Sequence, residues 1–419
     1  METELNSRSG HAAHSQNSSM RILSAVGPGD VIMAHRDWKN AVRTPSETSI
    51  TFSSQEFDFF SKHGVAFWAI SCFPRAECIN DGDSRVENRP RATTVALGGL
   101  NYHWVQLRYA LSLLVSAVRF RATHAVIDSG TTHWFALGLF RLFGIKVHPN
   151  FHNVYWPVGH PPQRRIGKII LRLDSFFFRL CVDSALGVSP SCGQQIGEIS
   201  MGNTRFFDYR AQFVRGDFGS LPRPRLVSPM RIMFAGRVEV SKGVFDILRI
   251  CEILEGRRPG QFVFDICGTG GASDLLAAQI KAARLGNSIT LHGKLMRPAL
   301  LKVYGDSHLV IVPTRSTFCE GLPMVCAEAV IAGRPVITSL LSNALEALRG
   351  AVVEAREDDP GDYAAKIEAL ADDPVAYAAL VRHTAMASVQ FTNPQGGLTY
   401  ALERCLLGSA DQTALEAEA

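Results

Sequence analysis

The sequence contains no paired cysteine motif and no long apolar run. Its nine cysteines are scattered and none forms a C-x-x-C pair, so the sequence indicates neither a zinc site nor a disulfide framework. This usage is typical of a reducing compartment, and we expect a cytoplasmic protein. No apolar stretch reaches the roughly 20 residues that a membrane-spanning helix requires.

An excess of charge of one sign is also missing. The formal net charge is only +4 over 419 residues, which does not predict binding to nucleic acid. The composition is 46% hydrophobic and 20% charged, as in ordinary globular proteins. A chain of this length favours two domains of about 200 residues each.

Both ends of the chain lack a run of large apolar residues. Residues 1–20 are rich in serine, histidine and asparagine and lack the apolar core of a signal peptide, and residues 409–419 are acidic. Such segments do not bury enough apolar surface to fold, so we expect both tails to be disordered.

Between the tails, strand-like and helix-like segments alternate. In the first half we expect strands at 30–35, 65–71, 93–97, 122–128, 146–152 and 185–189, and helices at 53–62, 104–120, 165–181 and from the turn at 128–130 to Gly144. A proline-rich linker at 221–229 separates this N-terminal domain, 21–220, from a second alternating series, 230–385. The alternation predicts an α/β protein with a doubly wound parallel sheet in each domain.

Two glutamates stand at the start of a helix in the second domain. A buried-looking strand, 309–313, leads toward Glu320, and the next helix is expected to begin at Pro323 and to stop at Gly333. Glu328 falls in the second turn of that helix. Both carboxylates can therefore line its positively polarised N-terminal end.

Glu328 is surrounded in the sequence by apolar residues, from Val325 to Ile331. A helix that is apolar on nearly all sides is usually buried, and a buried carboxylate must accept hydrogen bonds. Either the donors belong to the protein and Glu328 is structural, or they are hydroxyl groups of a ligand. We favour the ligand, because a second motif is suited to the same kind of molecule.

That second motif carries two cations on a strand-to-helix loop. The expected strand 231–235 ends at Gly236, and a helix is expected to begin near Ser241, a good N-cap residue. Arg237 and Lys242 therefore lie at the carboxyl end of a parallel sheet, where α/β proteins bind ligands. Two cations beside a helix N-terminus suit a diphosphate.

Together the two motifs resemble glycosyltransferase family four, whose members are retaining enzymes of the GT-B fold that use nucleotide sugars. The matching residues are Gly236-Arg237…Lys242-Gly243, the Glu-x7-Glu spacing of Glu320 and Glu328, and Gly333-Arg334-Pro335-Val336-Ile337. Two glycine turns also match, Gly268-Thr269-Gly270 after the strand 262–267, and Ile289-Thr290-Leu291-His292-Gly293. The specific part of the resemblance covers residues 230–355.

The resemblance implies a GT-B fold, in which two Rossmann-like doubly wound domains face a central cleft. The C-terminal domain would bind a nucleotide diphosphate sugar, and the N-terminal domain a sugar or a lipid-linked acceptor. Residues 386–408 would hold a helix that crosses back to the N-terminal domain. The implied activity is a retaining, hexosyltransferase-like sugar transfer, as in bacterial polysaccharide or glycolipid synthesis.

The resemblance also assigns roles to individual residues. Arg237 and Lys242 would neutralise the leaving diphosphate, Glu320 would orient the donor sugar, and His152, at the end of an expected strand, would face the reacting sugar. A structural histidine is the alternative at position 152. The residues expected to bind the donor are Gly236, Gly268, Gly293, Gly321, Leu322 and Glu328.

The first half departs from the family pattern. The family's glycine pair near the N-terminus is not found before the first expected helix, where Thr51-Phe52-Ser53-Ser54 stands instead. Asp81-Gly82-Asp83 is similar to a metal-binding D-x-D motif, but we expect it to lie in a polar loop, 78–90, without a hydrophobic strand leading directly into it. We read it as a turn, and we predict neither a catalytic metal nor another cofactor.

Several alternatives remain open. The helix expected within 161–181 combines cations with isoleucine and phenylalanine, so it could lie on an anionic membrane or pack as a domain helix with one basic face. We favour the packed helix and keep peripheral membrane contact as the alternative. For the activity, the alternatives are a nucleotide-sugar epimerase or phosphorylase of the same fold, and a non-catalytic subunit that binds nucleotide sugars.

Overall fold

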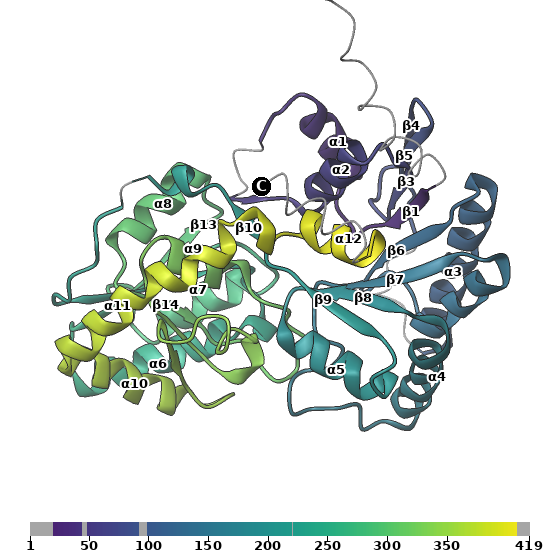
Figure 1. The fold of residues 1–419 in the computed structure, drawn as a ribbon. Coiled ribbons are helices and arrows are strands. Elements are labelled where there is room, and N and C mark those ends of the chain that lie inside the picture. The colour runs from purple at the N-terminus through teal and green to yellow at the C-terminus, as the bar shows by residue number, and fades with distance from the viewer. Residues whose placement is uncertain (1–19, 44–47, 92–98, 220, 409–419) are drawn as a thin grey trace, which may run out of the picture.

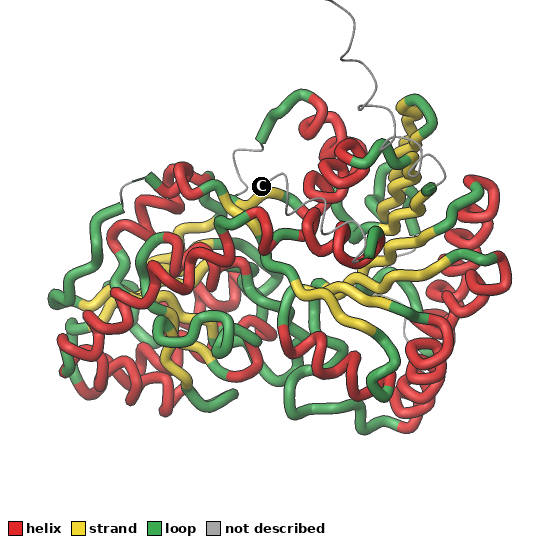
Figure 2. The backbone as a smooth tube through the Cα atoms, in the orientation of Figure 1, coloured by secondary structure: helices red, strands yellow, loops and turns green. Residues whose placement is uncertain are grey.

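Two α/β domains lie side by side in the computed structural model, which describes residues 20–43, 48–91, 99–219 and 221–408 (Figure 1). The strands form two separate groups with helices around each (Figure 2). The predicted strand at 93–97 and the two predicted disordered tails, residue 20 excepted, lie outside the described residues. Within the described ranges, every helix is too short or too polar to span a lipid bilayer.

The N-terminal domain is built on an eight-stranded sheet of order β4-β5-β3-β1-β6-β7-β8-β9. Its strands are β1 (Arg21–Ala25), β3 (Ala66–Ser71), β4 (Glu77–Asp81), β5 (Ser84–Asn88), β6 (His124–Asp128), β7 (Lys146–Phe151), β8 (Ser184–Gly187) and β9 (Arg205–Asp208). All neighbours are parallel except the β4–β5 pair. After β1 the chain adds strands on one side of it, as far as β4, and from β6 onward it adds them on the other side. The order of the strands therefore reverses between β1 and β6.

Helices cover both faces of this sheet. One face packs against α3 (Leu100–Phe120), the 3-10 helix η3 (Trp134–Phe143), α4 (Arg165–Cys181) and α5 (Pro190–Ser200), whose inward side chains share one core. The other face packs against α1 (Val31–Lys39), α2 (Phe52–Lys62) and α12 (Leu398–Leu406). Burial on both faces explains the nearly continuous apolar composition of β1, β3 and β6.

The C-terminal domain is built on a six-stranded parallel sheet of order β13-β12-β11-β14-β15-β16. Its strands are β11 (Met230–Ala235), β12 (Phe262–Cys267), β13 (Ile289–Gly293), β14 (Leu309–Val312), β15 (Val336–Thr338) and β16 (Val352–Glu354). Its helices are α6 (Val244–Arg257), α7 (Ser273–Ala282), α8 (Arg297–Asp306), α9 (Met324–Ile331), α10 (Pro360–Asp372) and α11 (Pro374–Ser388). The reversal in this sheet falls between β11 and β14.

The last helix returns to the N-terminal domain. Figure 1 shows α12 beside α2 after the chain has run along α11 over the other domain. The Gln55 side chain accepts from the Leu398 amide at 2.8 Å, and the Thr399 hydroxyl donates to the Gln55 carbonyl at 2.8 Å. Lys62 and Glu403 add an ion pair of 2.7 Å. A short ladder between β2 (Ser49–Ile50) and β10 (Gln212–Phe213) lies beside this crossing.

Two assignments in the first half of the sequence were wrong. The segment 30–35, predicted as a strand, begins helix α1, and its N-cap Asp30 accepts from the Met33 amide at 3.0 Å. A short apolar run does not distinguish a strand from a buried helix, and the true first strand, β1, went unrecognised. The segment 78–90, predicted as a polar loop, is mostly the β4–β5 hairpin, and only Gly82, at φ +58°, and Asp83 form its turn.

The predicted start of α6 was also wrong. Residues Val240–Lys242 form a 3-10 turn, and the helix proper starts at Val244 after Gly243, which has φ +73°. A Cβ at position 243 would lie 2.0 Å from the Pro313 carbonyl oxygen, so only glycine permits this approach. The tight turn places Lys242 beside the end of β14.

Candidate active site

The backbones at the carboxyl ends of β11, β12 and β13 contact one another through glycines. The Gly236 amide donates to the Cys267 carbonyl at 3.0 Å, and the Gly268 amide donates to the Gly293 carbonyl at 2.8 Å. Gly268 has φ +139°, and a Cβ there would lie 1.8 Å from the Gly236 carbonyl oxygen. The backbone turns therefore pack directly on one another and leave open space above the strand ends.

That space is a cavity of about 420 Å³ at the point where the sheet reverses direction. Ligands of doubly wound α/β proteins bind at such points. The cavity is lined by six of the residues predicted from the sequence: Gly236, Arg237, Lys242, Gly268, Glu320 and Glu328. The exposed Lys294, which follows Gly293, also lines it and adds a cation that sequence reasoning missed.

Lys242 and Glu320 form an ion pair at the wall of this cavity. The Lys242 ammonium group donates to Glu320 Oε2, and the Thr314 hydroxyl donates to the same oxygen at 3.2 Å. The Lys242 Nζ also lies 4.2 Å from the ring centroid of Phe318. The pair is largely shielded from solvent, with 17% of the Lys242 side chain and 9% of the Glu320 side chain exposed. Lys242 is thereby held facing the cavity.

Arg237 is held more loosely. It is 59% exposed and pairs with Glu239 at 2.7 Å. Its guanidinium carbon lies 5.9 Å from the Phe318 ring centroid. An exposed pair of this kind is worth little energy, so Arg237 can exchange Glu239 for another anion at small cost.

Glu328 is buried and its carboxylate is satisfied by protein hydroxyl groups. Thr48 donates to Oε1 at 2.5 Å, and Tyr304 donates to Oε2 at 2.7 Å. Burial raises the pKa of Glu328, and these two hydrogen bonds oppose that rise. Thr48 comes from the N-terminal domain, so the carboxylate links the two domains while it lines the cavity. Both carboxylate oxygens thus accept from hydroxyl groups of the protein.

Of the other predicted residues, Gly293 ends β13, and His152, Gly321 and Leu322 lie at the seam between the domains. A Cβ on Gly321 would lie 2.0 Å from the His152 carbonyl oxygen, so the two backbones touch only because residue 321 is glycine. The Glu320 carbonyl accepts from the Val154 amide at 3.2 Å and from the Asn343 side chain at 2.7 Å. Leu322 packs against core side chains of both domains. The structure thus brings the backbone around His152 against the backbone around Glu320, while the two residues line different cavities.

The His152 ring is fixed by a carboxylate. His152 Nε2 lies 2.9 Å from Asp128 Oδ2. Asn150 donates to the other Asp128 oxygen at 2.8 Å, and Tyr209 donates to Asn150 at 2.7 Å. Burial alone would lower the pKa of His152, but the Asp128 carboxylate outweighs it and raises that pKa above the ordinary value. The Asp128 carboxylate therefore orients the imidazole and favours its protonated form.

Sequence reasoning treated Asp128 only as part of a turn. Its position could have identified Asp128 as a site residue. It ends β6, and the neighbouring strand β7 leads directly to His152. The Gly27 amide, in the loop after β1, also donates to Asp128 at 3.3 Å. This loop, Val26-Gly27-Pro28-Gly29, contains two glycines near the N-terminus, where the sequence analysis found no glycine pair. They were overlooked because β1 was not recognised as a strand.

A second cavity, of about 700 Å³, lies at the reversal point of the N-terminal sheet. Asp128 and His152 line it, together with aromatic, carboxylate and hydroxyl side chains: Asp30, Asp37, Trp38, Ser49, Thr51, Phe52, Ser53, Ser54 and Asp58. Mixed aromatic and hydrogen-bonding walls suit a polyhydroxylated molecule. Thr51 also caps α2, accepting from the Ser54 amide at 3.1 Å.

The described residues contain no group of three or more histidine, cysteine or acidic side chains placed to hold a metal ion. Asp81, the last residue of β4, instead pairs with Lys39 at 2.6 Å, and neither it nor Asp83 lines the two cavities. The turn interpretation of this motif is confirmed, whereas the expectation of metal independence remains a prediction.

Comparison with known proteins finds a family that the second domain resembles. Residues 226–385 match the family described as glycosyl transferases group 1. A glycogen synthase of Mycobacterium tuberculosis is 30% identical over 126 residues, which are 30% of this chain and 29% of that protein. A D-inositol 3-phosphate glycosyltransferase of an Arthrobacter strain is 25% identical over 61% of this chain and 68% of its own length. The first match thus spans less than a third of the relative.

Solved structures share the whole architecture. A sucrose-phosphate synthase of Thermosynechococcus elongatus superposes with a TM-score of 0.68 at 14% identity, over 96% of this chain and all of that one. The Escherichia coli trehalose-6-phosphate protein bound with UDP-2-fluoro glucose gives 0.63 at 13% identity, over 88% and 95%. These likenesses confirm the predicted two-domain fold. The chain therefore has the GT-B fold, and its residues 226–385 match the family described as glycosyl transferases group 1.

Proposed function

We propose that this protein is a glycosyltransferase that moves a sugar from a nucleotide diphosphate sugar to an acceptor. The observation that carries the proposal is the 420 Å³ cavity, in which Arg237, Lys242, Glu320 and Glu328 meet beside the seam that holds His152. The group 1 domain supports it, and so does the fold shared with a protein that binds a UDP-sugar analogue.

Each residue then has a chemical task. Arg237 and Lys242 stabilise the negative charge that grows on the leaving diphosphate, as preorganised cations do in phosphate chemistry. Glu328 accepts hydrogen bonds from ribose hydroxyl groups. Glu320 and the amides near Gly321 and Leu322 orient the donor sugar.

The acceptor occupies the 700 Å³ cavity of the N-terminal domain. His152, held by Asp128, lies in the wall of that cavity and faces the sugar that is being transferred. The acceptor is a sugar or a lipid-linked molecule, because the lining combines carboxylates and hydroxyls with Trp38 and Phe52. We place the reaction in the cytoplasm, where nucleotide sugars are made.

We further propose that the enzyme belongs to glycosyltransferase family four and retains the configuration of the transferred sugar. The Glu-x7-Glu pair supports this assignment, since both carboxylates line the same cavity. The product's anomeric configuration, read by proton NMR, tests it: an inverted product would contradict it.

The second cavity also bears on the alternative functions. A nucleotide-sugar epimerase needs no acceptor pocket, and a phosphorylase accepts inorganic phosphate. A non-catalytic subunit would bind the donor without turnover. The large mixed lining beside His152 favours a transferase over an epimerase and over a subunit that binds only the donor, whereas a phosphorylase would bind its saccharide there and is distinguished by its product.

The proposed function is tested by incubating the protein with a panel of labelled nucleotide sugars. We expect one donor to bind and to be hydrolysed slowly in water, and sugar transfer when the correct acceptor is present. Mass analysis of the product distinguishes the classes. An isomerised nucleotide sugar, a sugar 1-phosphate, or binding without turnover would each contradict a transferase.

We expect this activity to survive removal of divalent metal ions. Arg237, Lys242 and Lys294 already surround the cavity, so cationic side chains are available where a metal would otherwise neutralise phosphate. The measurement is turnover before and after treatment with a chelator, and again after adding back manganese or magnesium. Strict dependence on either metal would contradict the expectation and would indicate that Asp81 and Asp83 had been wrongly dismissed as metal ligands.

A further inference from the structure

Three helical elements of the N-terminal domain expose apolar side chains on their outer side. The inward side chains of α3, η3 and α4 share one core against the sheet, so their outward side chains point away from it. We call this outer surface the α3–α4 face. Its exposed apolar residues are Leu100, Trp104, Leu111, Val115, Val118, Leu139, Leu142, Phe143, Ile166, Ile169, Leu173, Phe176 and Leu180.

Helix α4 is apolar on two sides. Phe177 and Phe178 are buried in the core, as the predicted packing role requires. A second row, Ile166, Ile169, Leu173, Phe176 and Leu180, recurs every three or four residues and faces solvent, with Phe176 58% and Leu180 63% exposed. Packing within the domain explains the buried apolar side of α4, but not the apolar row that faces solvent.

Helix α3 and η3 continue this apolar surface. Leu100 is 85% and Trp104 60% exposed, and the row extends along α3 to Val118. In η3, which packs between α3 and α4, Leu142 is 79% exposed. Exposed apolar surface that is contiguous over several elements marks an interaction site in soluble proteins.

The charge of the α3–α4 face has one sign. Helices α3 and η3 contain no acidic residue, and the one acidic residue of α4, Asp174, is buried and accepts from the Phe135 amide at 2.8 Å. The exposed cations on these elements are Arg108, Arg119, Arg141, Arg164, Arg165, Lys168, Arg172 and Arg179. Within the described part of the chain, none of them forms an ion pair with a carboxylate.

We propose that the α3–α4 face docks on the surface of an anionic phospholipid bilayer. The apolar rows would enter the boundary between headgroups and acyl chains while the flanking cations meet lipid phosphates, as in interfacial amphipathic helices. A second copy of this chain fits less well, since two such faces would bring like charges together. The proposal goes beyond sugar transfer and does not depend on which acceptor is used.

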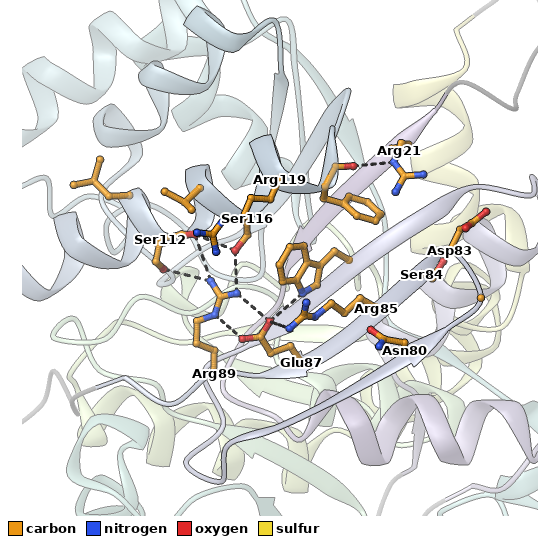
Figure 3. A pocket seen from close by; sticks show the side chains of 15 residues that line it. Arg21, Asn80, Asp83, Ser84, Arg85, Glu87, Arg89, Ser112, Ser116 and Arg119 are labelled. Carbon is orange, nitrogen blue, oxygen red and sulfur yellow. Dashed lines mark hydrogen bonds and ion pairs between the residues drawn. The ribbon is translucent and has the colours of Figure 1, made fainter.

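A basic groove adjoins the α3 edge of this face. Leu111 and Val115 of α3 also line a hollow of about 720 Å³, shown in Figure 3, together with Arg21, Arg85, Arg89 and Arg119. Glu87 lies between two of these arginines and bonds to Arg89 at 2.8 and 3.0 Å. Arg119 forms no ion pair within the described residues. Guanidinium groups bind phosphate with fixed geometry, so the groove suits the headgroup of one bound lipid.

The test is co-sedimentation of the full-length protein with vesicles of phosphatidylglycerol and phosphatidylcholine, compared with vesicles of phosphatidylcholine alone. We expect binding only to the anionic vesicles, weakening as salt is added. Phe176→Ser should weaken it about tenfold, because a large apolar side chain no longer enters the bilayer. Lys168→Gln should weaken it about fivefold.

Matched controls come from the C-terminal domain. Met386→Ser removes an exposed apolar side chain of α11, and Lys366→Gln removes an exposed cation of α10. Both should bind vesicles like the unmodified protein, and all four variants should melt within a few degrees of it. Binding to neither vesicle, or equal losses in the controls, would overturn the proposal. So would a concentration-dependent dimer, seen by sedimentation, that Phe176→Ser abolishes.

Discussion

Lys242→Ala should lower sugar turnover by about 100- to 1,000-fold, the usual effect of removing one preorganised group that stabilises transition-state charge. The effect should be large because the Lys242 ammonium group is mostly shielded from solvent and fixed by Glu320 and Phe318. Arg237→Ala should also reduce turnover, but less, because Arg237 is 59% exposed and more strongly screened. The measurement is steady-state turnover with the donor identified by screening.

A structural effect of Lys242→Ala can be separated from a chemical one. The single variant leaves the Glu320 carboxylate shielded without its cation, so the melting temperature should fall. The double variant Lys242→Ala/Glu320→Gln removes both charges and should recover much of that melting temperature without recovering turnover. Arg249→Ala, which removes an exposed cation of α6, is the matched control. Normal turnover in Lys242→Ala would refute the role of Lys242 at the diphosphate.

Glu328→Gln should weaken the binding of the nucleotide diphosphate about tenfold or more. A hydrogen bond to a charged group is worth about 1.5–3 kcal/mol, and the carboxamide cannot accept from two ribose hydroxyl groups as the carboxylate does. The loss should be similar for the nucleotide and for the full nucleotide sugar. Glu320→Gln should instead weaken the nucleotide sugar more than the bare nucleotide. Calorimetric titration of each variant with both ligands measures these differences.

The competing interpretation of Glu328 is that it serves the core, since Thr48 and Tyr304 already bond to it. Tyr304→Phe provides the comparison, because it removes one protein donor while leaving the carboxylate in the cavity. We expect Tyr304→Phe to lower the melting temperature and to keep nucleotide binding. If Glu328→Gln behaves in the same way, with normal binding and a lower melting temperature, then Glu328 is structural.

The residues that line the 420 Å³ cavity were predictable because their pattern is encoded locally. Gly236 follows a strand, Lys242 precedes a helix, and Glu320 and Glu328 flank the start of α9. The direction of a parallel strand then carries each loop to the same edge of the sheet. Such short-range patterns depend on neighbours within a few residues, so the sequence displays them directly.

The first domain was less predictable for an equally physical reason. Its opening strand and the helix after it are both short apolar segments, and hydrophobic periodicity does not distinguish them. Missing β1 also hid the glycine loop that contacts Asp128. Helix α4 shows the opposite case: its limits were predicted correctly, but the sequence alone did not reveal that one of its two apolar sides faces solvent.

The sequence by itself determined the two-domain α/β organisation, the cationic loop and the paired glutamates, since spacing along the chain specifies all three. Only the tertiary structure placed Asp128 against His152, Thr48 against Glu328, and the Gly321 backbone against the His152 carbonyl. These contacts join residues that are far apart in the chain. They arise from the order of strands in a sheet and from the packing of one domain on the other, which no local pattern of residues specifies.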